Sequence, residues 1–136
     1  MGSFVVEDGR FGNLDTVRLT STTTGARAVI ARRGATLLRW APAIGAQWPS
    51  DDGFVDGYLD EDELLAQAGV RSGVMAPFSN RIRNGVYTFG GERHALLPGV
   101  PGPERLVYHG FLRLLDCDVV DTEVTDSDIR LSLIHI

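Results

Sequence analysis

The chain has 136 residues, of which 43% are hydrophobic and 23% charged, and this composition fits one soluble globular domain or part of one. A formal charge of −5 argues against a general nucleic-acid binder, and no apolar run reaches the roughly 18 residues of a transmembrane helix. We therefore expect a protein that binds neither nucleic acid nor membrane. The first eight residues lack the basic and apolar regions of a signal peptide, so we expect a cytoplasmic location.

Short segments typical of β-strands follow one another along the chain. Residues 17–20 alternate apolar and polar side chains, which is the period of a half-buried strand. Gly90 and Gly91 predict a tight hairpin after a strand at residues 86–89. Further strands are expected at residues 28–31, 35–40, 106–109, 117–120 and 129–131. The spacing favours an all-β antiparallel sandwich over alternating strands and helices.

One short helix is expected after Asp60, which is a good N-cap residue with Glu63 three positions later. Leu64, Leu65 and Ala68 supply an apolar face. Gly69 is a natural residue to end the helix, because glycine readily adopts a left-handed conformation.

Metal and thiol chemistry is not indicated by the sequence. Cys117 is the only cysteine, so an internal disulfide or a multi-cysteine metal site is impossible. Its two neighbours are Asp116 and Asp118, whose charges disfavour a thiolate, and we expect a packed thiol. The histidines are well separated and lack acidic residues at ligand spacing, so neither a metal nor another cofactor is predicted.

Asn80, Arg81 and His109 are the candidate functional residues. An arginine offers five fixed N–H donors and an asparagine offers both donors and an acceptor, which suits a hydroxyl-rich ligand. Neighbouring residues of an ideal strand face opposite sides, so Asn80 and Arg81 can serve one pocket only if the backbone twists there. His109 is suited to proton transfer near neutral pH. From composition alone, an exposed strand arginine and a structural histidine remain the alternatives.

The local charge supports an oxygen-rich ligand. Residues 71–113 contain six arginines and two glutamates, a local net charge of +4 in a chain of −5. The positive charge is therefore concentrated around the candidate residues.

The sequence MAPFSNRIRNG at residues 75–85, followed by YHGF at residues 108–111, resembles the aldose 1-epimerases of the galactose mutarotase type. The similarity covers about residues 14–130 and is strongest over residues 73–113. It implies a galactose mutarotase-like antiparallel β-sandwich whose enzyme interconverts α and β anomers of free hexoses by ring opening and re-closure. It also implies that Asn80, Arg81 and His109 bind the sugar, with His109 counted as catalytic, and that no cofactor is needed.

The resemblance further implies that the chain is part of a longer protein. Members of that family run on the order of 300 residues, and their acid–base pair, a histidine and a late glutamate, lies beyond the region covered here. We therefore expect residues 1–130 to be the N-terminal portion of a single domain that is inactive alone. Residues 131–136, LSLIHI, are compatible with codons of a transposon end used to prepare sequencing libraries, and we expect them to be an artefact.

Two alternative functions stay open. A hexose-6-phosphate 1-epimerase would need cationic anchors for the phosphate, which Arg71, Arg83 or Arg93 could provide. A non-catalytic carbohydrate-binding β-sandwich is the other alternative, because a fold does not fix a function.

Overall fold

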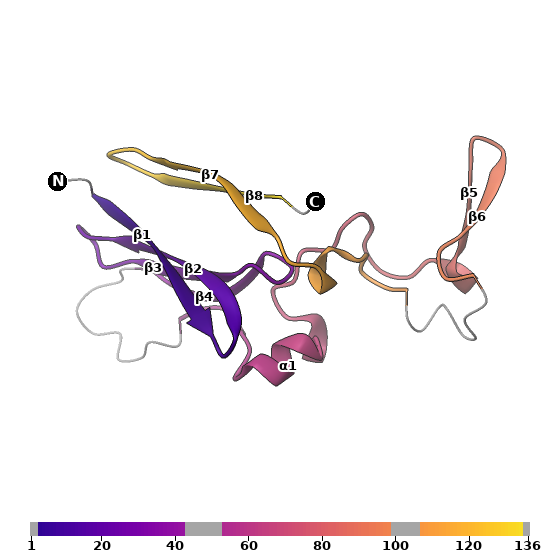
Figure 1. Cartoon of the computed structure of the whole chain (residues 1–136), viewed down its shortest axis with the longest axis horizontal. Coiled ribbons are helices and arrows are strands. Elements are labelled where there is room, and N and C mark those ends of the chain that lie inside the picture. Colours follow the sequence, from indigo (N-terminus) through magenta and orange to yellow (C-terminus); the bar gives the residue numbers. More distant parts are fainter. Residues whose placement is uncertain (1–2, 43–52, 99–106, 135–136) are drawn as a thin grey trace.

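A computed structural model of the chain describes residues 3–42, 53–98 and 107–134, and these are mostly antiparallel strands (Figure 1). Four strands form one sheet in the order β1-β2-β3-β4, and the other four form two separate hairpins. The strands are β1 (Phe4–Phe11), β2 (Leu14–Ser21), β3 (Arg27–Ala31), β4 (Thr36–Ala41), β5 (Val86–Phe89), β6 (Glu92–Ala95), β7 (Asp118–Val124) and β8 (Ile129–Ile134). The α-helix α1 (Glu61–Leu65) and 3-10 turns at Ala68–Val70, Arg83–Gly85 and Leu112–Leu114 complete the described structure.

The four-stranded sheet has two apolar faces. Along β2, β3 and β4, Leu19 pairs with Ala28 and Ala28 pairs with Trp40, so these three side chains share one face. The other face packs onto the main hydrophobic core, in which Ala31, Leu38, Tyr58 and Leu64 are almost fully buried. Because Leu64 comes from α1, the helix covers this second face, and Figure 1 shows it below the sheet.

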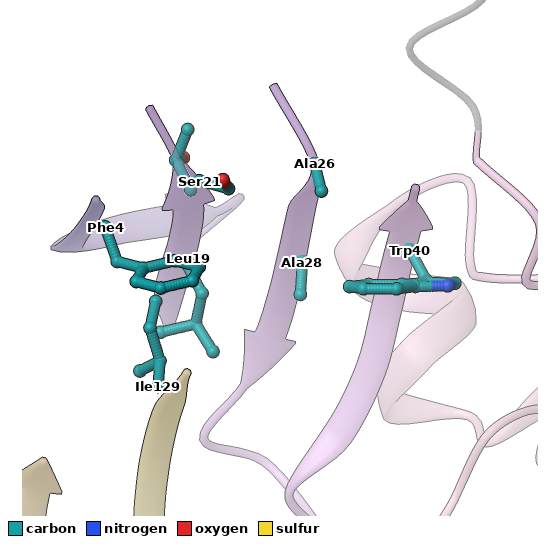
Figure 2. A pocket seen from close by; sticks show the side chains of 8 residues that line it. Phe4, Leu19, Ser21, Ala26, Ala28, Trp40 and Ile129 are labelled. Atoms are coloured by element: carbon teal, nitrogen blue, oxygen red, sulfur yellow. The ribbon is translucent and has the colours of Figure 1, made fainter. Parts of the chain in front are cut away.

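The β7–β8 hairpin lies on the first face. Ile129, at the start of β8, lines an apolar cavity of about 170 Å³ together with residues of the sheet (Figure 2). Phe4, Leu19 and Ile129 lie on one side of this cavity and Trp40 on the other, with Ala28 between them (Figure 2). The sheet is therefore covered by α1 on one side and by the hairpin on the other, as Figure 1 also shows.

The strand predictions are confirmed except at residues 106–109. There the structure has a single bridge between Tyr108 and Arg81, preceded by the fully buried Val107, while residue 106 lies outside the described residues. The N-terminal strand β1 was not predicted, since Glu7, Asp8 and Gly9 interrupt its apolar alternation. All eight residues of β1 pair with β2, and the backbone hydrogen bonds to this neighbour stabilise the strand despite its weak apolar pattern.

The helix prediction is confirmed at its start but not along its length. The Asp60 carboxylate accepts the backbone N–H of Glu63 at 2.8 Å, as a capping residue should. The helix ends at Leu65, however, before the predicted stop, and Gln67 already has a left-handed φ of 53°. Leu64 is fully buried whereas Leu65 is 43% exposed, so the prediction that Leu65 belongs to the buried face is wrong. A helix this short presents a single turn to the core.

Cys117 anchors the segment before β7 and is a packed thiol, as predicted. Its backbone N–H donates to the Arg32 carbonyl at 2.9 Å, and its side chain is only 2% exposed. Burial raises the pKa of the Cys117 thiol, and the charges of Asp116 and Asp118 raise it further. The thiolate form is thus disfavoured, and the thiol has a structural role.

Candidate functional site

The candidate residues lie where two segments, residues 76–81 and 108–112, run against each other. The Ala76 carbonyl accepts the backbone N–H groups of Phe111 at 2.7 Å and Leu112 at 3.1 Å. Bridges between Ala76 and Gly110 and between Arg81 and Tyr108 bring the two segments into register. Three of the four bridging positions are therefore within one residue of a candidate residue.

Gly110 is required for this close approach. It has a φ of 69°, and a Cβ atom built at this position would lie only 1.9 Å from the Ala76 carbonyl oxygen. Any other residue would therefore push the two segments apart.

Asn80 and His109 hold each other in unusual backbone conformations. Both have a left-handed φ of 57°, and asparagine and histidine are among the non-glycine residues that tolerate this region best. The His109 backbone N–H donates to the Asn80 carbonyl at 2.8 Å, and the Asn80 backbone N–H donates to the His109 side chain at 3.0 Å. The twist expected between Asn80 and Arg81 is thus present.

The hydrogen bond from Asn80 also defines how His109 can act. Because the Nδ1 atom of His109 accepts the Asn80 N–H, the proton of the neutral imidazole must sit on Nε2. That nitrogen is then a donor, and the half-buried side chain can present it to a ligand oxygen.

The Asn80 side chain has a local structural role as well. Its Oδ1 atom accepts the backbone N–H of Arg81 at 2.9 Å, an interaction that stabilises the turn. The two N–H donors of the Asn80 side-chain amide make no hydrogen bond among the described residues. Asn80 therefore organises the site while keeping its donors available.

The Arg81 guanidinium is exposed and lies over the Tyr108 ring, with 5.5 Å between Cζ and the ring centroid. Within residues 3–42, 53–98 and 107–134, its side chain makes no ion pair or hydrogen bond, so all its donors can address a ligand. The structure thus brings Asn80, Arg81 and His109 together at one crossing.

Two neighbours of the site were not found from the sequence. Tyr108 contacts His109 edge to face, with 5.3 Å between the ring centroids. Arg113 is only 4% exposed, and its Cζ lies 4.6 Å from the centre of the Tyr108 ring. An aromatic residue before the histidine and an arginine four positions after it were the only available signals, and neither indicates a contact without the fold.

The other arginines considered as phosphate anchors differ in their surroundings. Arg71 forms ion pairs with Glu63 and with Asp56, so its charge is already neutralised. Arg83 and Arg93 are exposed, and no carboxylate of the described residues lies within ion-pairing distance of them. His94 stacks on Tyr87 across the β5–β6 hairpin, with 5.1 Å between the ring centroids.

The described part of the chain holds neither a candidate metal cluster nor a candidate membrane-spanning helix. It contains no cluster of three or more histidine, cysteine, aspartate or glutamate side chains that could hold a metal ion. It also contains no helix long and apolar enough to cross a membrane.

Comparison with known proteins supports the resemblance found in the sequence. The family model described as aldose 1-epimerase matches residues 15–135, and the chain therefore belongs to the aldose 1-epimerase family. No curated protein sequence matches the chain.

A solved structure similar to this one is the galactose 1-epimerase from Lactobacillus acidophilus NCFM, with a TM-score of 0.56 and 20% sequence identity. The match covers 90% of this chain and 34% of that protein, so the chain spans about a third of its length. The similarity supports the predicted galactose mutarotase-like fold.

Proposed function

We propose that this chain supplies the sugar-binding part of an aldose 1-epimerase that acts on unmodified hexoses of the glucose or galactose type. The main support is the crossing at which Asn80 and His109 hold each other and the Arg81 guanidinium is unpaired within the described structure. Membership of the aldose 1-epimerase family adds the reaction class. A cytoplasmic location remains part of this proposal.

In the proposed reaction, a glutamate removes the proton of the anomeric hydroxyl while a histidine protonates the ring oxygen. Each such acid–base contribution is worth about 10²–10⁴-fold in rate. Both groups belong to the part of the enzyme that lies outside this chain. Arg81 binds sugar hydroxyls, and His109 donates from Nε2 to the ring oxygen, where negative charge develops as the ring opens.

We further propose that residues 1–130 are the N-terminal portion of a longer domain and are inactive alone. The chain corresponds to 34% of the length of the similar galactose 1-epimerase, which supports this assignment. We retain the proposal that residues 131–136 are not native. Their alternating leucines pair with β7 as residues of β8, which any alternating apolar sequence could do.

Sequencing of the source DNA tests the proposed chain extent. We expect the reading frame to continue past Arg130 with residues other than LSLIHI and to encode the missing histidine and glutamate. Independent reads that return the same six codons followed by a stop would show that the tail is native.

Polarimetry tests the proposed activity in the full-length protein, meaning the product of the complete reading frame. We expect faster mutarotation of α-glucose or α-galactose than the spontaneous rate. Acceleration only with hexose 6-phosphates would favour a phosphate-specific enzyme, whose phosphate the exposed Arg83 or Arg93 could bind more readily than Arg71, which is already paired with carboxylates. Sugar binding without acceleration of any aldose would instead identify a carbohydrate-binding module.

A further inference from the structure

The Tyr108 ring is shared by two arginines of very different exposure. The exposed Arg81 lies over it at 5.5 Å and the buried Arg113 at 4.6 Å, measured from each Cζ to the ring centroid. Tyr108 also pairs with Arg81 through the backbone bridge between their segments. The ring is thus held close to the base of the Arg81 side chain as well as to its end.

Arg113 contacts both the ring and the backbone carbonyl of Tyr108 and so fixes its position. One of its terminal nitrogens (NH2) donates to the Tyr108 carbonyl at 3.4 Å, and its Nε atom is buried without a partner in the described structure. A buried cation is costly unless it is compensated, and among the described residues no carboxylate pairs with it. The ring and the carbonyl of Tyr108 are its compensating contacts, so Arg113 and Tyr108 form one unit.

A ring contact suits an arginine that must bind a ligand. Arginine has a long side chain that loses about 2 kcal/mol of rotamer freedom when it is fixed. A carboxylate partner would fix the side chain before the ligand binds and so reduce the entropy lost on binding. It would also occupy the N–H donors that the ligand needs. An aromatic face attracts the cation and occupies none of them.

We propose that Tyr108, supported by Arg113, is a positioning residue that holds the Arg81 guanidinium ready for sugar binding. This inference rests on the proposed function of Arg81. Tyr108 itself makes no contact with the sugar in this proposal, and the ring, not the hydroxyl, performs the role.

The test compares Tyr108→Leu with Tyr108→Phe in the full-length protein. Tyr108→Leu should raise KM for the sugar by about 2- to 5-fold, which is the range of an exposed cation–π contact, with little change in kcat. Tyr108→Phe should restore the lower KM because it keeps the ring. In an Arg81→Ala background, Tyr108→Leu should have no further effect on KM.

Tyr87→Leu is the matched control, since Tyr87 is an exposed tyrosine that stacks on His94 and contacts none of the site residues. It should leave KM unchanged. A wild-type KM in Tyr108→Leu, or an equal increase in Tyr108→Leu and Tyr108→Phe, would overturn the proposed role of the ring.

NMR provides a readout that does not depend on activity. The side-chain protons of Arg81 should show an aromatic ring-current shift that persists in Tyr108→Phe and disappears in Tyr108→Leu. If the full-length protein accelerates no aldose but this shift is present, the proposed function fails while the contact stands. If the shift is absent in the wild type, the positioning role is wrong whatever the activity.

Discussion

At the scale of single residues, the site depends on two left-handed conformations that stabilise each other. A residue held in such a conformation costs about 1–3 kcal/mol and persists only where its surroundings determine it. Asn80 and His109 meet this condition through the two hydrogen bonds that join them at 2.8 and 3.0 Å. The bond from the Asn80 N–H to Nδ1 also selects the Nε2–H form of His109, so local backbone geometry and proton position are coupled.

Arg81 and His109 should have separable kinetic effects in the full-length protein. Arg81→Ala should mainly raise KM, because each charge-assisted hydrogen bond to a sugar hydroxyl is worth about 1.5–3 kcal/mol. His109→Ala should also lower kcat, because its bond to the ring oxygen strengthens as charge develops there. Polarimetry at several sugar concentrations measures both parameters.

Arg10→Ala is a suitable control for these variants, since Arg10 is exposed and pairs with Asp15 at the edge strand β1. It should have wild-type kinetics. Wild-type kinetics in Arg81→Ala or in His109→Ala would remove that residue from the site.

Gly110→Ala should disrupt the crossing of the two site segments. The new Cβ would meet the Ala76 carbonyl oxygen at 1.9 Å, and the φ of 69° would add strain. We expect a lower melting temperature and at least a tenfold loss of kcat/KM, about 1.4 kcal/mol, because a small misplacement of binding groups is enough for that.

Gly90→Ala is the matched control for this substitution. Its φ of 59° is similarly left-handed, but no atom lies within 4 Å of its added Cβ. It should cost only the backbone strain of about 1 kcal/mol and leave the kinetics unchanged. Equal effects of the two substitutions would show that strain, not the close contact with Ala76, is responsible.

At the scale of elements, Glu63 connects α1 to Leu59, in the loop before the helix, and to Arg71 after it. Its carboxylate accepts the backbone N–H of Leu59 at 2.7 Å and forms an ion pair with Arg71, whose Cζ lies 4.6 Å from the centre of the Tyr58 ring. The bond from Leu59 lowers the pKa of Glu63 below its ordinary value of 4.5, and Arg71 lowers it further. The Glu63 carboxylate therefore joins the helix to Arg71, and Arg71 in turn contacts the ring of the core residue Tyr58.

This arrangement predicts an acid-dependent loss of stability. A carboxyl group with a lowered pKa in the folded state stabilises the protein above its unfolded pKa, and the contribution disappears as the pH falls through the folded value. For Glu63 the loss should begin near pH 4.5 and continue below it. Melting temperatures between pH 6 and pH 3 should decrease more steeply in the wild-type full-length protein than in Glu63→Gln.

Glu61→Gln is a neighbouring control, because the Glu61 carboxylate binds the backbone and side chain of Asn13 and not Arg71. Its pH profile should keep the steep wild-type decrease. Identical profiles in the wild type and Glu63→Gln would exclude a contribution from the Glu63 charge.

At the scale of the whole molecule, the described structure buries few large apolar side chains. Leu64 and Val107 are the largest apolar side chains that are fully buried. Large apolar residues are exposed in both hairpins, with Phe89 at 77% and Val120 at 57%. A two-stranded hairpin is only marginally stable in water, so β5–β6 and β7–β8 have little stability of their own.

Residues 1–130 expressed alone should therefore be insoluble or molten. Exposed apolar side chains and unpaired strand edges favour aggregation over cooperative folding. Circular dichroism in the near-ultraviolet region and thermal unfolding measure this directly. A soluble monomer with a sharp cooperative transition would show that the segment is a complete small domain.

The sequence by itself determined most of the strands, the start of the helix and the family. Alternating side chains located β2 and β8, a short apolar run located β3, glycines located the β5–β6 turn, and Asp60 located the start of α1. These features depend on neighbours within a few residues, so local patterns are sufficient to predict them. The sequences around Arg81 and His109 likewise carried the family resemblance that the family match confirms.

Only the tertiary structure decided how the site is held together. Tyr108 forms a bridge to Arg81 across 27 positions instead of extending a strand, and Arg113 is buried beneath its ring. At the same crossing, Gly110 allows the chain to pass directly against Ala76. Such a contact depends on where distant segments meet, and no periodicity in either segment contains that information.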